Sequence, residues 1–240
     1  MNWEPWTGCY KVSDGCTYCY FYGPYSKRCG QNEVVKTDDF FKPIETVYMP
    51  RKKITKYKIE GGKQVNVCFT TDFFLPEADE WRAEAWSMMR ERSDLNFMFI
   101  TKRIDRFEVS LPQDWGEGYD NVIIGCTVEN QETVGYRLPL FVNFPIKHRF
   151  ITCSPLLSEI DLSSYLNNIE TVSVSGESGR EARVCDYDWV TGIKSQCESA
   201  GVPFAFRSTG SRFLIDGEIR KINPKLQHKT AREFGINTGE

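Results

Sequence analysis

Residues 65–80, VNVCFTTDFFLPEADE, contain the structural unit on which the rest of the chain is built. The first five residues form a mostly apolar, strand-like run, which ends in the polar cluster Thr70, Thr71 and Asp72. Pro76 then stands where proline is favoured, at the first position of a helix, and acidic residues follow in the first turn, where the helix dipole favours them. The stretch therefore predicts a buried strand, a polar strand end and a helix.

The same unit recurs about six times along the chain. Further strand-like runs lie at residues 97–101, 122–127, 149–153, 171–175 and 203–206. Apolar strands that alternate with helices are typical of a parallel sheet buried on both faces, and right-handed crossovers curl such a sheet into a barrel. We therefore expect an α/β fold, a partial (β/α)6-type barrel whose functional site lies at the carboxyl ends of the strands.

The expected barrel domain covers residues 1–206, and residues 207–240 are expected to form a C-terminal hairpin and tail packed on the same domain. The pair Asp216-Gly217 is a strong hairpin signal. Alternation near a Gly-Gly break predicts a second hairpin or an extended excursion in residues 50–63. A short helix is expected at residues 20–27.

One later helix has clear end signals. Asp186 is expected to cap its N-terminus and Gly201 to end it, as these residue types do at helix ends. Its expected apolar face consists of Trp189, Ile193 and Cys197.

The composition is that of an ordinary globular protein, with 240 residues, 40% hydrophobic and 26% charged. A net charge of −3 predicts no strong overall attraction to nucleic acid or membranes. No apolar run approaches the ~20 residues of a membrane span, and the N-terminus does not resemble a signal peptide. We therefore expect a cytoplasmic protein without a membrane partner, in which nine cysteines do not form a disulfide framework.

Three of the cysteines cluster near the N-terminus, within residues 1–20, MNWEPWTGCYKVSDGCTYCY. Six residues separate Cys9 from Cys16 and two separate Cys16 from Cys19, and a glycine directly precedes each of the first two. Three thiolates on a short, glycine-containing loop are typical of a metal centre, and iron–sulfur clusters are held by such ligands. We expect a cluster here with one iron left open.

The alternative for these cysteines is a structural zinc site, in which Cys29 would be the fourth ligand of a closed tetrahedron. Cys68, Cys126 and Cys153 lie inside apolar runs and are expected to be small core residues.

The cysteine loop and six further segments resemble the radical SAM superfamily, and more closely the phage- and mobile-element-associated radical-SAM-like family. The segments are WEPWTGCYKVSDGCTYCY, TTDFF, FITKR, GCTVENQ, FITCSPLL, SGESG and AGVPFAFRSTG. The resemblance implies a [4Fe–4S] cluster on Cys9, Cys16 and Cys19, with S-adenosylmethionine bound at the open iron. Reductive cleavage of S-adenosylmethionine would give a 5′-deoxyadenosyl radical that abstracts hydrogen from a substrate.

The resemblance also implies roles for residues near the strand ends. Tyr18 would lie beside the adenine, and the group at Thr70, Thr71 and Asp72 would receive the methionine amine. The methionine carboxylate would pair with Lys102 or Arg103, of which the bidentate arginine is the better candidate. The residues implied for the ribose hydroxyls are Thr127, Glu129 and Asn130.

The residues left for the substrate are Ser154, Glu177, Ser178 and Arg207. The related family usually has a carboxylate where Ser154 stands, and Lys-Gln-Trp where residues 207–209 stand, so this chain departs from its pattern at these positions. Two simpler interpretations stay open: the carboxylates Asp72, Glu129 and Glu177 can serve helix N-termini, and Lys102 and Arg103 can belong to a solvated loop.

Two basic clusters make nucleic acid the favoured substrate and a peptide the second choice. Their members are Arg51, Lys52, Lys53, Lys56 and Lys58, and then Arg207, Arg212, Arg220, Lys221, Lys225, Lys229 and Arg232. A charged hairpin face and tail without any partner is the simpler explanation of both clusters, because surface lysines need no partner. The expected protein partners are an electron donor of the flavodoxin or ferredoxin type and a second radical SAM protein. The alternative function is a non-catalytic, zinc-stapled nucleic-acid-binding module.

Overall fold

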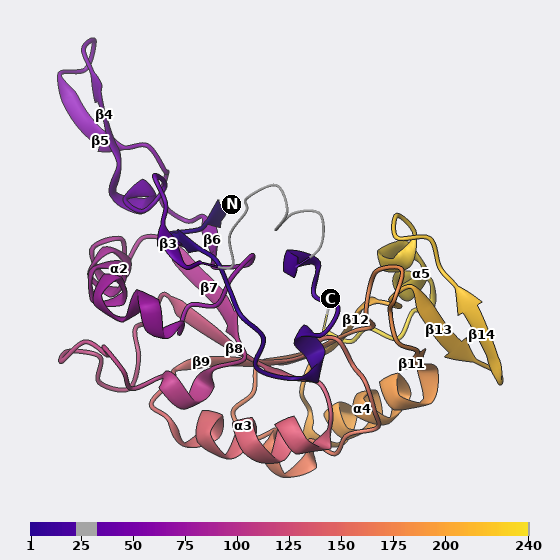
Figure 1. The fold of residues 1–240 in the computed structure, drawn as a ribbon. Coiled ribbons are helices and arrows are strands. Elements are labelled where there is room, and N and C mark those ends of the chain that lie inside the picture. Colours follow the sequence, from indigo (N-terminus) through magenta and orange to yellow (C-terminus); the bar gives the residue numbers. More distant parts are fainter. Residues whose placement is uncertain (23–32, 240) are drawn as a thin grey trace. The chain divides into compact units, whose positions relative to one another are not determined.

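The computed structural model describes residues 1–22 and 33–239 (Figure 1). Most of the helix expected at residues 20–27 lies outside the described residues, and so does Cys29, the fourth ligand of the zinc alternative. Within them, a 3₁₀ helix, η2, covers Tyr20–Tyr22, and another, η1, covers Asp14–Cys16.

Seven strands form the main parallel sheet, which confirms the predicted α/β class. In spatial order they are β1 (Asn2–Trp3), β6 (Gln64–Val67), β7 (Asn96–Thr101), β8 (Val122–Val128), β9 (His148–Cys153), β10 (Thr171–Ser175) and β12 (Phe204–Ser208). From β6 onward each strand lies beside the next one of this sheet along the chain. This is the strand order of a partial (β/α) barrel.

Helices follow the strands as predicted. The α-helices are α2 (Asp79–Glu91) after β6, α3 (Gln131–Asn143) after β8, and α4 (Tyr187–Ala200) after β10. The 3₁₀ helices elsewhere are η3 (Lys42–Ile44), η4 (Pro76–Ala78), η5 (Ile104–Arg106) and η6 (Ser163–Tyr165). Pro76 begins η4, which leads directly into α2, so the proline marks the helical start that the sequence predicts.

Helix α4 confirms both end signals but corrects its buried face. The Asp186 carboxylate accepts a hydrogen bond from the Asp188 amide, and Gly201 adopts the left-handed conformation with φ 69°. The buried residues are Val190, Ile193 and Cys197, whereas Trp189 is only partly buried. Val190 lies three residues before Ile193 and seven before Cys197, in line with both, whereas Trp189 lies eight before Cys197 and therefore at the border of this face.

The chain divides into two compact units. Of the described residues, unit 1 contains 1–10, 33–124 and 145–148, and unit 2 contains 11–22, 125–144 and 149–239. The core of unit 1 is aromatic: the Phe73 ring stacks on Phe99 at 4.6 Å between centroids and meets Trp86 edge-on at 4.8 Å.

The C-terminal segment contains the predicted hairpin. Strands β13 (Arg212–Ile215) and β14 (Glu218–Lys221) pair antiparallel, and both turn residues, Asp216 and Gly217, have positive φ. Strand β11 (Cys185–Asp186) joins β13 to complete a three-stranded sheet. The expected tail contains a helix that the sequence reasoning missed, α5 (Gln227–Glu233).

Two small antiparallel sheets complete the elements. Strands β2 (Trp6–Thr7) and β3 (Val35–Lys36) form one, and β4 (Thr46–Met49) and β5 (Ile54–Tyr57) form the other. The hairpin predicted in residues 50–63 therefore exists, but it begins before Pro50 and ends before the Gly-Gly pair. Among the described residues, no helix combines the length and apolar character needed to cross a bilayer.

Candidate functional site

The three cysteines of the N-terminal loop differ from the other described cysteines in their environment. Cys9 and Cys19 are partly exposed, and Cys16 lies just under the surface at the end of η1. In contrast, burial raises the pKa of the Cys68 and Cys153 thiols well above the ordinary value. Together with the burial of Cys126, this confirms the prediction that Cys68, Cys126 and Cys153 are core residues.

Burial also raises the pKa of the Cys185 and Cys197 thiols to about 12. A protonated thiol is a poor metal ligand, because the thiolate is the coordinating form. The N-terminal loop therefore carries the described cysteines best suited to hold a metal.

In unit 1, Arg103 holds the loop at Cys9 and Tyr10. Its Nη2 donates to the Tyr10 carbonyl oxygen at 2.6 Å, its guanidinium lies 4.6 Å from the Tyr10 ring centroid, and its Nη1 lies 4.0 Å from Cys9 Sγ. Burial alone would lower the pKa of Arg103, but Asp72, Cys9 and Tyr10 raise it. Arg103 is therefore a fixed cation beside the first thiol.

Asp72 keeps Arg103 in this position. Its carboxylate lies 3.4 Å from Arg103 Nη1 and also accepts hydrogen bonds from Thr101 Oγ1 at 2.8 Å and from the amides of Lys102 at 2.9 Å and Phe74 at 3.0 Å. The aspartate thus binds residues at the ends of two neighbouring strands, β6 and β7. Its bond to the Phe74 amide agrees with the simpler interpretation, in which the carboxylate binds nearby backbone.

The two threonines of the same strand end contact other parts of unit 1. Thr70 donates its hydroxyl to Glu4 Oε2 at 2.9 Å, and its amide also binds this carboxylate. Thr71 donates its hydroxyl to the carbonyl oxygen of Gly8, directly before Cys9. Glu4 was missed by the sequence reasoning, although its place between Trp3 and Trp6 beside the cysteines is a signal that could have drawn attention to it.

In unit 2, Glu129 lies directly under the loop that carries Cys16. The Ser13 hydroxyl donates to Glu129 Oε1 at 2.9 Å. A Cβ atom added to Gly15 would come within 2.5 Å of the same carboxylate, so only glycine lets the loop approach this closely. Glu129 is completely buried, and Arg137 Nη1 binds its second oxygen at 2.8 Å.

Arg183 is the counterpart of Arg103 in unit 2. Its Nη2 donates to the Asp14 carbonyl oxygen at 2.9 Å, and its guanidinium lies 5.3 Å from the centroid of the Tyr18 ring. The buried Glu177 carboxylate accepts from Arg183 Nη2 at 2.6 Å and Nε at 2.9 Å. Hydrogen bonding to Glu177 raises the pKa of Arg183.

Four further residues that the resemblance implies have partners within unit 2. Asn130 caps α3 in a capping box with Thr133, and the backbone oxygen of Thr127 accepts from Arg137. The Ser178 hydroxyl donates to Gln227 Oε1 at 2.5 Å, and the carbonyl oxygen of Arg207 lies 2.7 Å from His228 Nδ1.

Ser154 and Lys102 are both partly buried near strand ends. Ser154 follows β9 and precedes Pro155, whereas Lys102 follows β7 and donates its backbone amide to Asp72.

The three cysteines are shared between the two compact units. In the part of the chain that the structure describes, no three cysteine, histidine, aspartate or glutamate side chains are grouped as metal ligands. Cys9 belongs to unit 1, whereas Cys16 and Cys19 belong to unit 2. The fit of a cluster therefore depends on the donor chemistry: the partly exposed Cys9 and Cys19, the shallow Cys16 behind a glycine that packs against a carboxylate, and a cation beside Cys9.

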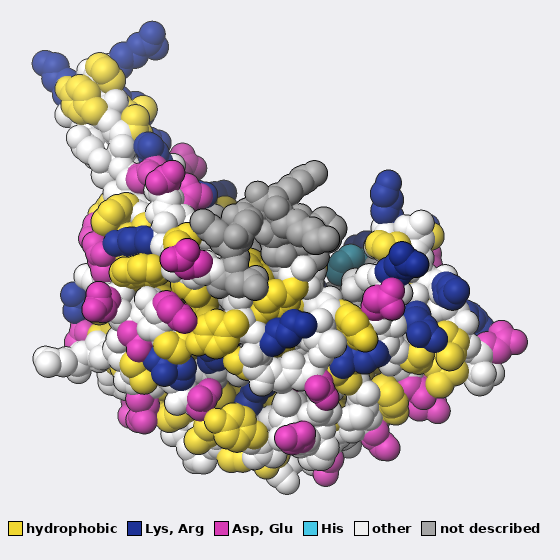
Figure 2. Space-filling model, in the orientation of Figure 1, with side chains coloured by type: hydrophobic (Ala, Val, Ile, Leu, Met, Phe, Trp, Pro, Cys, Tyr) yellow, Lys and Arg dark blue, Asp and Glu magenta, His cyan; other side chains and the backbone are white. Residues whose placement is uncertain are grey.

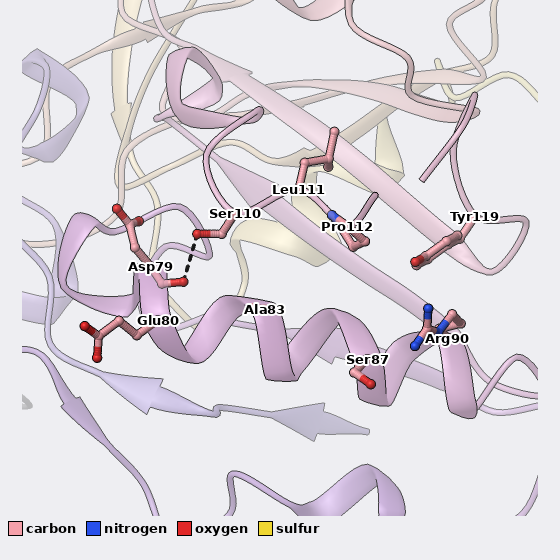
Figure 3. A pocket seen from close by; sticks show the side chains of 9 residues that line it. All are labelled: Asp79, Glu80, Ala83, Ser87, Arg90, Ser110, Leu111, Pro112 and Tyr119. Atoms are coloured by element: carbon pink, nitrogen blue, oxygen red, sulfur yellow. Dashed lines mark hydrogen bonds between the residues drawn. The ribbon is translucent and has the colours of Figure 1, made fainter. Parts of the chain in front are cut away.

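A separate hollow of about 420 Å³ lies in unit 1 between α2 and residues 110–119 (Figure 3). Asp79 and Ser110 line one end, where the Ser110 hydroxyl donates to the Asp79 carbonyl oxygen at 2.9 Å. Arg90 and Tyr119 line the other end, and both bind Asp114. Asp79 pairs with Arg82 and Arg106, and Arg90 pairs with Asp114, so these charges already have partners within the protein and we assign no ligand to this hollow.

The strand order and the N-terminal cysteine loop define the class: an α/β protein of the partial-barrel type with a thiol-rich loop that is held by residues near the strand ends. The chain belongs to the family DUF5131, described as a protein of unknown function, whose sequence profile matches residues 1–234. No curated protein and no solved structure matches the chain.

Proposed function

We propose that this protein is a radical SAM enzyme whose [4Fe–4S] cluster is held by Cys9, Cys16 and Cys19. The observation that carries the proposal is the way the loop is held. In unit 1 and again in unit 2, an arginine paired with a buried carboxylate donates to a carbonyl oxygen of the cysteine loop and lies against a loop tyrosine. A loop with no binding role would not need two such supports.

The cofactor supplies the difficult chemistry when bound: S-adenosylmethionine at the open iron is a source of a radical that removes hydrogen from the substrate. The protein's own residues bind and orient. The Arg103 cation lies 4.0 Å from Cys9 Sγ, where it can offset the negative charge of a metal-bound thiolate. Tyr18 is partly fixed by Arg183, which suits a ring placed beside the adenine.

The contacts refine the roles that the resemblance implies. Both carboxylate oxygens of Asp72 already accept hydrogen bonds, so we assign Asp72 to positioning Arg103. The hydroxyl oxygens of Thr70 and Thr71 donate within the protein but keep lone pairs that can accept from the methionine amine. Glu129 and Glu177 are likewise assigned to holding the loop.

The proposed substrate is nucleic acid, with a peptide as second choice, and Ser154, Ser178 and Arg207 are candidates to contact it. An electron donor of the flavodoxin or ferredoxin type would reduce the cluster, and a second radical SAM protein is the proposed assembly partner. The competing function is a zinc-stapled nucleic-acid-binding module without catalysis, which the same thiols favour if they bind zinc.

Anaerobic reconstitution with iron and sulfide tests the proposal. We expect about four iron and four sulfide per chain, and loss of both in Cys9→Ala, Cys16→Ala and Cys19→Ala. Cys29→Ala is the matched control: it should keep the cluster, whereas a zinc site would lose metal. Addition of S-adenosylmethionine and reductant should release 5′-deoxyadenosine. A colourless protein that binds zinc instead would establish the competing function.

A further inference from the structure

Residues 46–57 form an arm that extends from unit 1, made of β4, β5 and the turn between them (Figure 1). In the described part of the chain, the two strands pair only with each other. At ~3.4 Å per residue, the arm reaches about 17 Å from its base to its turn.

The base of the arm is fixed to its unit, so the arm is presented in a defined direction. The Tyr57 hydroxyl donates to Glu91 Oε1 at 2.6 Å, and the Arg92 guanidinium lies 4.1 Å from the Tyr57 ring centroid. Below them, the Lys58 amide donates to the Glu45 carbonyl oxygen at 2.8 Å. Helix α2 and the chain before β4 thus hold the arm.

The arm concentrates positive charge on a chain that is negative overall. Residues 46–57 include the cations Arg51, Lys52, Lys53 and Lys56 but no acidic residue, whereas the whole chain has a net charge of −3. Dark blue side chains mark the end of the arm in Figure 2. Among the described residues, no acidic side chain pairs with the three cations of the turn, whereas Lys56 pairs with Glu60 at the base at 3.6 Å.

The arm also exposes large apolar side chains on both faces. The strand register places Val47, Met49, Ile54 and Lys56 on one face and Thr46, Tyr48, Thr55 and Tyr57 on the other. Val47, Tyr48 and Ile54 are 41%, 58% and 47% exposed. A two-stranded ribbon buries too little apolar surface to form a core of its own. Packing inside the arm therefore does not account for these exposed apolar side chains.

The turn places a cation where glycine is favoured. Lys53 has φ 51°, in the left-handed region that side chains other than glycine, asparagine and aspartate seldom adopt. A lysine at this position adds charge to the turn at a conformational cost. Charge at the end of the arm is therefore consistent with a binding role.

We propose that the arm binds duplex DNA, with the ribbon in the major groove and the turn cations at the phosphates. The major groove is about 12 Å wide and admits a two-stranded ribbon. Cations at its rim bind the phosphate backbone, while Val47 and Ile54, which are exposed on the same face of the ribbon, can contact thymine methyl groups. The inference deepens the proposed function by naming the nucleic acid, but the binding needs no cluster.

The test measures binding of the full chain to a random-sequence DNA duplex by fluorescence anisotropy across a salt series. The variant Arg51→Gln/Lys52→Gln/Lys53→Gln should bind at least about tenfold more weakly than wild type and reduce the salt slope by about two to three. The control Lys63→Gln/Lys147→Gln/Arg180→Gln removes the same charge at exposed positions outside both basic clusters and should change affinity less than about threefold. Lys52→Arg/Lys53→Arg should keep binding.

Three outcomes would contradict the proposal that the arm binds duplex DNA. They are no duplex binding by wild type at low salt, equal losses in the tip variant and the control, or tighter binding of single-stranded DNA or RNA of the same length. Iron loading separates this result from the proposed function. If the tip variant loads iron normally but binds the duplex more weakly, the proposal that the arm binds DNA is supported. If the chain never loads iron but binds the duplex as expected, only the proposed enzyme activity is refuted.

Discussion

Arg183 and Glu177 form a two-point ion pair, with Nη2 2.6 Å from Oε1 and Nε 2.9 Å from Oε2. The same Nη2 reaches the Asp14 carbonyl oxygen at 2.9 Å, so the pair connects the turn after β10 to the loop that carries Cys16. The carboxylate is buried and the guanidinium is about one-third exposed. Loss of either partner therefore affects both the stability of unit 2 and the position of the segment that carries Cys16.

Arg183→Ala should lower the free energy of unfolding by about 1–2 kcal/mol, because it leaves the buried Glu177 carboxylate without its charged partner. Urea denaturation followed by circular dichroism measures this. Arg180→Ala is the matched control, since its side chain is 96% exposed and should change stability by less than about 0.5 kcal/mol. Equal effects of the two substitutions would show that the pair contributes nothing.

Gly15→Ala should impair cluster loading, because the added methyl group would overlap the Glu129 carboxylate, 2.5 Å away, and push the Cys16 segment outward. We expect less iron per chain after reconstitution together with reduced thermal stability. Gly192→Ala provides the contrast: a Cβ there meets nothing within 4 Å, so it should stabilise α4 by about 0.5–1 kcal/mol. Full iron content in Gly15→Ala would contradict the close packing.

Glu129→Gln should destabilise unit 2 by about 3–5 kcal/mol, because Arg137 would then be a buried cation without a carboxylate. Glutamine keeps the size of the side chain and can still accept a hydrogen bond from Ser13. The loss of stability therefore measures the effect of removing the negative charge. Thermal and urea unfolding measure the change. Glu132→Gln, at an exposed site in the first turn of α3, should be close to neutral.

Glu4→Gln should change how stability depends on pH. Burial raises the pKa of Glu4 above its ordinary value of 4.5, although the hydrogen bonds from Thr70 and Phe69 oppose the shift. The folded protein then binds a proton more tightly than the unfolded chain does, so the contribution of Glu4 is full below pH 4.5 and is lost as the pH rises through the raised value.

The measurement is the free energy of unfolding of wild type and Glu4→Gln across that pH range. Wild type should lose stability relative to the variant as the pH rises, and the difference should level off above the raised value. A constant difference at every pH would mean that Glu4 titrates alike in the folded and unfolded chains.

The fold was largely predictable because each element carries local signals. The helix start near Pro76, the cap at Asp186, the end at Gly201 and the turn at Asp216-Gly217 all depend on residues that are neighbours in sequence. The predictions were wrong or incomplete where tertiary packing determines which residues are buried or helical. Val190 is buried more completely than Trp189, and α5 lies in a segment whose sequence pattern is weak.

The candidate site was predictable only as a set of residue types. Cysteine spacing and polar strand ends identified Cys9, Asp72, Glu129 and Glu177, but nothing local indicates that the last three carboxylates bind arginines. Ser13, a member of the cysteine loop, contacts a carboxylate 116 residues away. Such pairs depend on how the strand ends are placed in three dimensions, which no local pattern encodes.

By itself, the sequence determined the alternation of strands and helices, the thiol-rich loop and the helix and turn ends, because these follow from backbone preferences and short-range periodicity. Only the tertiary structure decided that Arg103 pairs with Asp72 and Arg183 with Glu177, and that both hold the cysteine loop. The reason is physical: a buried carboxylate needs a charged partner, and the packing of distant segments selects which cation reaches it.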